Sequence, residues 1–206
     1  MIRREDFEIM APVGSWESLA AAFSAGADAV YFGIEGLNMR SRSSANFTMD
    51  DMDNIVAECN RHGVKSYLTV NTVVYDSDIS LLHNIIDRAK QAGISAIISA
   101  DMAAILYARQ IGQEVHISTQ VNVANADAVR FYSQFADVMV LARELNMEQV
   151  KGITDQIRNE DIKGPNGEPV RIEMFCHGAL CMAVSGKCYM SLHQMNSSAN
   201  RGACNQ

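Results

Sequence analysis

The sequence predicts an α/β fold, a TIM-like (β/α) barrel that is incomplete, with about seven βα units and no eighth strand. Seven short, mostly continuously apolar runs recur along the chain, as expected for parallel strands buried on both faces. Amphipathic helical patterns separate these runs. Gly26, Gly63 and Gly93 each follow a helical pattern and precede an apolar run, where glycine can end a helix in the left-handed conformation.

The apolar runs give the expected strands. They cover residues 8–13, 29–33, 66–72, 96–99, 115–120, 137–141 and 170–175. Each is of ordinary strand length. A polar stretch with two prolines and two glycines, residues 163–169, is expected to form a surface turn before the seventh strand.

The expected helices carry apolar residues on one face and polar capping residues at their starts. The spacing i, i+3, i+4, i+7 holds for Trp16, Leu19, Ala20 and Phe23, and it recurs over residues 82–89 and 128–135. Ser15, Thr48 with Asp51, and Asn125 stand where helices should begin. Helices and strands therefore alternate along the chain.

Seven successive βα-type units favour a barrel over an open, doubly wound sheet, which is the alternative. We expect residues 1–206 to form one barrel-type domain, the truncated N-terminal part of a longer protein. Without an eighth strand the sheet would keep an open edge with unpaired backbone groups. A homo-oligomer formed through this open barrel edge is the expected consequence.

Composition limits the cellular setting and the partners. The chain has 206 residues, of which 48% are hydrophobic and 20% charged, and no apolar run approaches the ~20 residues of a membrane span. The first residues are charged and resemble no signal peptide, so we expect a cytoplasmic protein with reduced thiols and no membrane contact. The net charge of −7 argues against a protein that grips a long nucleic-acid backbone. Any contact with RNA should be local.

Polar side chains follow nearly every expected strand, at the edge where parallel barrels build their active sites. Asn71 follows the third strand, Gln120 and Asn122 end the fifth, and Arg143 and Glu144 follow the sixth. Arg40 and Arg42 lie in a long polar loop after the second strand. Alternative interpretations are a solvated Arg143–Glu144 ion pair, arginines that only decorate the loop, and helix caps at Asp101 and Asn125.

Four of the five cysteines gather in the last 31 residues, at Cys176, Cys181, Cys188 and Cys204. Thiolates at one strand end suit either a soft metal or a nucleophile with its neighbours. The spacing matches neither a zinc ribbon nor a ferredoxin, so it does not name the metal. Cys59 shares a helix face with apolar residues and is expected to be structural, and Cys176 is expected to pack inside the barrel at the end of the seventh strand.

The stretch from Glu173 to Ser191, Glu-Met-Phe-x-His-Gly-Ala-Leu-Cys-Met-x-x-Ser-Gly-x-Cys-Tyr-Met-Ser, resembles the signature of the collagenase-like peptidase family of unknown catalytic type. Further matches are residues 10–15, 25–33, 38–47, 118–125 and 141–144, so the resemblance covers nearly the whole chain. It implies two functions. One is the peptidase of the family label. The other is oxygen-independent hydroxylation of a tRNA or rRNA base, or in ubiquinone biosynthesis, with a four-iron four-sulfur cluster and prephenate.

By motif position, the resemblance implies that Cys181, Cys188 and Cys204 are cluster ligands. The fourth ligand would lie beyond residue 206, and Cys176 is the nearest substitute. Iron–sulfur hydroxylation acting on RNA or a small-molecule carboxylate is the favoured interpretation, and a Cys181 nucleophile paired with His177 is the alternative. Arg40, Arg143 or both would bind a carboxylated co-substrate. Asn71, Gln120 and Asn122 would orient it, with Glu144 and His177 nearby.

Overall fold

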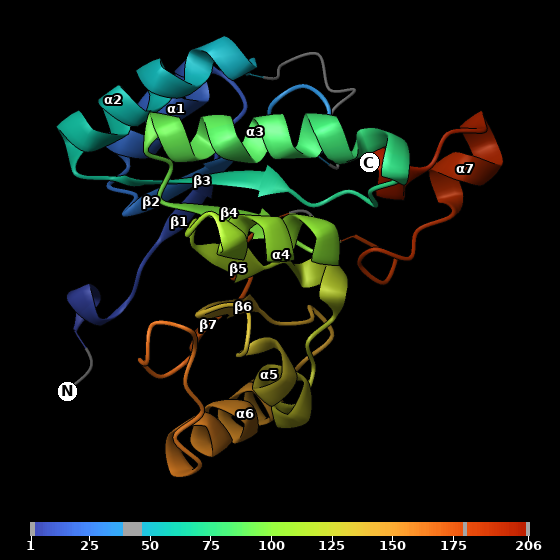
Figure 1. Ribbon diagram of the computed structural model, residues 1–206. Helices are drawn as coiled ribbons and strands as arrows, with labels where there is room; N and C mark the ends of the chain where they lie inside the picture. The colour runs from blue at the N-terminus through green and yellow to red at the C-terminus, as the bar shows by residue number, and fades with distance from the viewer. Residues whose placement is uncertain (1–2, 39–46, 179–180, 205–206) are drawn as a thin grey trace.

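The computed structural model describes residues 3–38, 47–178 and 181–204, and these contain one parallel sheet of seven strands. The strands follow one another in sequence order, and each pairs in parallel with the next. They are β1 (Met10–Pro12), β2 (Ala29–Phe32), β3 (Lys65–Val70), β4 (Ala96–Ser99), β5 (Val115–Ile117), β6 (Val138–Val140) and β7 (Arg171–Glu173). Figure 1 shows the helices packed around the outside of this sheet.

A helix stands between each pair of consecutive strands, which is the βα repeat that the sequence predicts. The helices are α1 (Trp16–Ser24), α2 (Met52–His62), α3 (Ile79–Ala92), α4 (Met102–Gln110), α5 (Ala126–Tyr132), α6 (Met147–Asn159) and the short α7 (Met190–Met195). Short 3₁₀ helices are η1 (Arg4–Asp6), η2 (Met49–Asp51), η3 (Asp76–Asp78), η4 (Thr119–Val121) and η5 (Ala199–Arg201).

The expected local signals are confirmed. Ser15 and Asn125 cap α1 and α5 by accepting a backbone N–H, and Gly63 and Gly93 end α2 and α3 in the left-handed conformation. Residues 163 and 169 form the bridge of the expected polar turn. The strands are shorter than expected, by three residues at the carboxyl end of β5, because the chain turns there into η4.

The incomplete barrel is confirmed, and the doubly wound alternative is wrong, because such a sheet reverses its strand order and this one does not. Side chains from alternate strands meet inside the curve of the sheet. The rings of Tyr67 on β3 and His116 on β5 lie 4.6 Å apart between centroids, across the intervening β4. This is how the interior of a (β/α) barrel is filled.

The core has two parts, on the two faces of the sheet. The larger part packs between helices and strands and includes Leu19, Ile55 and Ile86, all almost completely buried. The smaller part lies inside the curve of the sheet and comprises Ala29, Tyr67, Ala96 and Ile98, with Met10 and Tyr31 against them. The small alanines leave room there for the long polar side chains of neighbouring strands.

Within the described residues, β1 and β7 each pair with one other strand, so the sheet has two edges. Association of two copies through these edges stays a prediction. Among the same residues, no helix combines the length and the apolar character that crossing a membrane requires.

Candidate functional site

The cysteine-bearing segment, residues 181–204, lies at the carboxyl ends of the strands. In Figure 1, α7 and the last residues stand on the side toward which the strand arrows point. Backbone and side-chain hydrogen bonds tie this segment to loops that follow β3, β5 and β6. This is the end of a (β/α) barrel where active sites form.

A pocket of about 170 Å³ opens at this end. Strand-end loops and the cysteine-bearing segment line it together, through Asn71, Thr72, Val73, Ala100, Asp101, Gln120, Gly186 and Asn200. Sites for complete drug-sized ligands usually measure ~300–1,000 Å³. This pocket therefore suits one ring or one polar substituent of a larger ligand.

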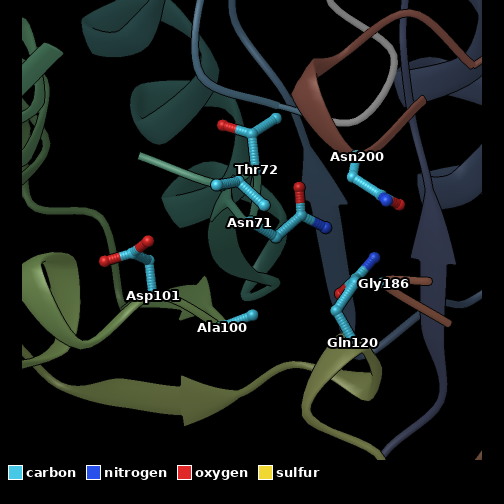
Figure 2. A pocket seen from close by; sticks show the side chains of 8 residues that line it. Asn71, Thr72, Ala100, Asp101, Gln120, Gly186 and Asn200 are labelled. Atoms are coloured by element: carbon cyan, nitrogen blue, oxygen red, sulfur yellow. The ribbon is translucent and has the colours of Figure 1, made fainter. Parts of the chain in front are cut away.

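Three carboxamides, those of Asn71, Gln120 and Asn200, converge on the pocket (Figure 2). Gln120 accepts a hydrogen bond from the Ser118 hydroxyl through Oε1, which leaves its Nε2 to donate. Asp101 also lines the pocket, but its two oxygens accept the backbone N–H groups of Val74, at 3.1 Å, and Ala103, at 2.9 Å. The lining holds no Lys, Arg or His, so it favours a neutral polar group.

Gly186 forms a wall of the pocket at a position that strongly favours glycine. Its φ is +72°, and a Cβ there would lie 2.8 Å from the backbone oxygen of Gln120. The absence of a side chain lets the cysteine-bearing segment approach the end of β5 this closely. The pocket therefore depends on the segment that carries the thiols.

Arg143 and Asn122 bind the loop between Cys181 and Cys188. Arg143 Nη2 donates to the Ala183 carbonyl at 3.0 Å and to Ser185 Oγ at 2.7 Å, and Asn122 Nδ2 donates to the Ser185 carbonyl at 2.7 Å. Arg143 Nε and Asn122 Oδ1 are buried and have no hydrogen-bond partner in the described part of the chain. Arg143 thus binds the cysteine loop through Nη2, while its Nε can still donate and Asn122 Oδ1 can still accept a hydrogen bond.

Cys181 is the thiol whose acidity is altered in this region. A hydrogen bond from the Ala183 N–H, with a smaller contribution from the Arg143 guanidinium, lowers the pKa of Cys181 below the ordinary thiol value. A thiolate is both the nucleophile and the metal ligand among the forms of cysteine. The site therefore prepares Cys181 for either role.

Thiolates are the ligands of iron–sulfur clusters, so the donor type of Cys181, Cys188 and Cys204 suits such a cluster. Their arrangement does not. Across residues 3–38, 47–178 and 181–204, no three His, Cys, Asp or Glu side chains are grouped so that they could hold a metal ion. The residues as placed do not form a three-thiol site.

The remaining expected site residues are distributed as follows. Arg40 and Arg42 lie outside the described residues. Glu144 and His177 are exposed at the mouth of the barrel, the end formed by the carboxyl ends of the strands, and do not line the pocket. Cys59 is buried in α2, as expected, and burial raises the pKa of its thiol to about 11. The expectation that Cys176 packs inside the barrel is wrong: β7 ends at Glu173, and Cys176 is exposed.

Sequence reasoning missed Asn200, Gly186 and Ser185. They lie between Cys181 and Cys204, where the cysteines are the stronger chemical signal. The Ser-Gly pair at 185–186 is a turn signal that could have marked a close backbone approach. Nothing local indicates that Asn200 meets the end of β3, because that contact spans more than a hundred residues.

Comparison with known proteins agrees with the geometry. The sequence model described as peptidase family U32 matches residues 14–206. A protein named collagenase from Porphyromonas gingivalis is 68% identical over 98% of this chain and 49% of its own length. The tRNA hydroxylation protein P1 of Bacillus subtilis is 33% identical over 97% of this chain and 45% of its own.

Among solved structures, the U32 peptidase Mk0906 superposes with a TM-score of 0.59 and 14% identity, over 81% of this chain and 66% of that one. At this identity the likeness concerns the fold alone. The chain spans about half the length of the curated relatives it matches.

Proposed function

This chain belongs to peptidase family U32, and we propose that it is the barrel part of a protein that hydroxylates a base in RNA. The observation that carries the proposal is that Gly186 and Asn200, from the segment that bears the thiols, form the wall of the carboxamide pocket. The pocket therefore shares a wall with the segment that bears the thiols. A relative of the same family, 33% identical, is named for tRNA hydroxylation.

The pocket lining supports a base as the group that enters it. Gln120 keeps its Nε2 to donate, and a carboxamide N–H can bind an acceptor atom on a base edge. Enzymes that modify a base take it out of the stack and read its edge in a pocket. About 170 Å³ suits a single ring whose ribose and phosphates stay outside. The net charge of −7 is consistent with a local contact to RNA.

A carboxylated co-substrate such as prephenate would bind elsewhere in the mouth. The pocket offers no cation, and Asp101 would oppose a second carboxylate there. Arg40 and Arg143 are the proposed partners for it, and Arg143 would bind it through atoms other than the Nη2 that is engaged with the cysteine loop.

We propose that Cys181, Cys188 and Cys204, with a fourth ligand beyond residue 206, hold a four-iron four-sulfur cluster. Such a cluster would supply the electron transfers that hydroxylation without oxygen needs. Since the described thiols are not grouped for a metal, their segments would have to move closer to bind it. Iron and sulfide contents after anaerobic reconstitution, for this chain and for the longer protein, test this point.

The hydroxylation itself is tested in cells that lack the gene and are complemented with variants of the full-length protein. We expect wild type to restore a hydroxylated pyrimidine nucleoside, measured by mass spectrometry of digested RNA. Asn71→Ala and Gln120→Ala should reduce it strongly, whereas Asn159→Ala, on the exposed end of α6, should not. An unchanged nucleoside profile in the deletion strain would refute the proposal.

The second candidate is a thiol peptidase, because the pKa of Cys181 is lowered and a relative 68% identical is named collagenase. The groups that lower the pKa of Cys181 are the Ala183 N–H and Arg143, and His177 is exposed, so we expect no cleavage of denatured collagen by iron-free protein. Cleavage that survives chelation and disappears in Cys181→Ala would establish the peptidase and displace the hydroxylation proposal.

A further inference from the structure

Asn200 lies at a junction of three parts of the mouth. Its Oδ1 accepts the backbone N–H of Cys188 at 3.3 Å, and its Nδ2 donates to the Cys188 carbonyl at 3.2 Å. Its own backbone oxygen accepts the N–H of Val73, after β3, at 3.0 Å. The same side chain lines the pocket. Asn200 thus contacts Cys188, the loop after β3 and the pocket.

Arg201 fastens the neighbouring residues to the same loop. Its Nη1 donates to the Val73 carbonyl at 2.7 Å and pairs with Asp78, and its guanidinium stacks 4.0 Å from the centre of the Tyr75 ring. The hydrogen bond from Arg201 is the first cause that holds the pKa of Asp78 below its usual value. Val73 is therefore bound at both its N–H and its carbonyl by two successive residues of the cysteine-bearing segment.

The turn that leads to Cys204 is also fixed. Gly202 and Ala203 donate backbone hydrogen bonds to Ala199 and Ser198, and the side chains of Ala199 and Ala203 are 1% and 2% exposed. A buried, hydrogen-bonded turn transmits the position of residues 200 and 201 to Cys204. Cys188 and Cys204, separated by 15 residues in sequence, are both held relative to Val73.

We propose that Asn200 and Arg201 are positioning residues that fix Cys188 and Cys204 relative to the pocket and to the loop after β3. A ligand in the pocket contacts Asn200, so its binding acts on the backbone of Cys188 through the paired hydrogen bonds. The importance of the two thiols rests on the proposed function. The positioning itself is measurable in iron-free protein, whether or not that function holds.

The test is the alkylation rate of each cysteine by iodoacetamide, resolved by mass spectrometry in the iron-free full-length protein. Exposed Cys176 is the internal reference for reactivity, and buried Cys59 reports global opening. We expect Asn200→Ala to raise the rates of Cys188 and Cys204 relative to Cys176 by roughly fivefold, the factor that one lost hydrogen bond represents. Asn200→Asp keeps the acceptor and loses the donor, so its effect should be smaller.

Arg201→Ala should raise the rate of Cys204, and Arg201→Lys, which keeps a cation for Asp78, should restore most of the protection. Asn159→Ala and Arg109→Ala, both at exposed helix positions, are the matched controls and should leave all ratios unchanged. Unchanged Cys188 and Cys204 ratios in Asn200→Ala would overturn the proposal. An increase that Cys59 shares would also overturn it, because it would mean general destabilisation.

Discussion

The two ends of the barrel interior use polar side chains in opposite ways. At the amino end, charged and aromatic groups from alternate strands bond one another: Glu8 accepts from Tyr67 at 2.7 Å and pairs with Lys65, and Arg171 pairs with Glu114 at 3.1 Å. At the carboxyl end, carboxamides converge on a pocket, and the cysteine-bearing segment is held mainly through backbone groups. The amino end pairs most of its charged groups with one another, whereas at the carboxyl end Arg143 Nε and Asn122 Oδ1 have no hydrogen-bond partner among the described residues.

The carboxyl groups of this region differ in how well they are paired. Burial acts to raise the pKa of Glu8, but hydrogen bonds from Lys65 and Tyr67 outweigh it and the pKa is lowered. The His116 ring, whose Nε2 lies 3.4 Å from the carboxylate, is the first cause that lowers the pKa of Glu114. Glu173 is different: it is the last residue of β7, at the carboxyl end of the strand, and has no ion-pair partner among the described residues. Burial, followed by repulsion from Glu8, raises its pKa to about 7.

This comparison teaches that the ion pairs between neighbouring strands lie at the amino ends of those strands, whereas Glu173, at the carboxyl end of β7, has none among the described residues. Conservative replacements of paired and unpaired groups should therefore have different consequences. Replacing Glu173, the unpaired carboxyl group, should change how stability depends on pH. Replacing residues of the pocket wall should change the pocket and the thiols more than the pH dependence.

The largest effect is expected for Glu173. Its pKa is near 4.5 when unfolded and about 7 when folded, so the folded state holds a proton that the unfolded state has released between these values. The stabilisation is complete below pH 4.5 and is lost as pH rises through 7, by about 3 kcal/mol as an upper limit. Urea unfolding of Glu173→Gln between pH 5 and 8 should lack this loss and show higher stability at pH 8.

Glu168→Gln, in the polar turn before β7, is the matched control and should keep the wild-type pH dependence. If wild type and Glu173→Gln had the same pH profile, the pKa of Glu173 would not be raised in the folded protein. The contrast between paired and unpaired carboxyl groups would then be wrong.

Gly186→Ala should disturb the carboxyl end alone. The added Cβ meets the Gln120 oxygen at 2.8 Å and forces a residue with a side chain to φ +72°, at a cost of about 1–3 kcal/mol. We expect the cysteine-bearing segment to detach locally, with faster amide exchange over residues 184–188 and little change in the strands.

Gly152→Ala is the control for that experiment, because Gly152 lies within α6 and a Cβ there meets nothing within 4 Å. It should stabilise the protein by ~0.5–1 kcal/mol. If Gly186→Ala destabilised residues 184–188 and the strands to the same extent, the mouth and the barrel would unfold as one unit.

The smallest effect is expected for Cys59, which belongs to neither end. Cys59→Ala removes one buried sulfur from α2 and should cost ~1 kcal/mol or somewhat more. Iron content after reconstitution should equal that of wild type. A loss of iron would place Cys59 among the cluster ligands and remove it as a neutral reference for the comparison.

The sequence alone determined the elements and their order. Apolar periodicity located the seven strands and their helices, the residues Ser15 and Asn125 marked helix starts, and successive βα units predicted the incomplete barrel. These features depend on residues close together in the chain, whose preferences act locally. The motif around Cys181 and Cys188 was sufficient to indicate the family.

Only the tertiary structure decided which polar residues act together. Asn71, Gln120 and Asn200 converge because the register of β3, β4 and β5 brings their ends to one level and Gly186 permits close approach. Arg143 looked like a free carboxylate partner, yet its guanidinium binds the cysteine loop. The raised pKa of Glu173 depends on burial and on Glu8, 165 residues earlier. These contacts and this pKa depend on residues that packing brings together from distant parts of the chain, so no local pattern in the sequence encodes them.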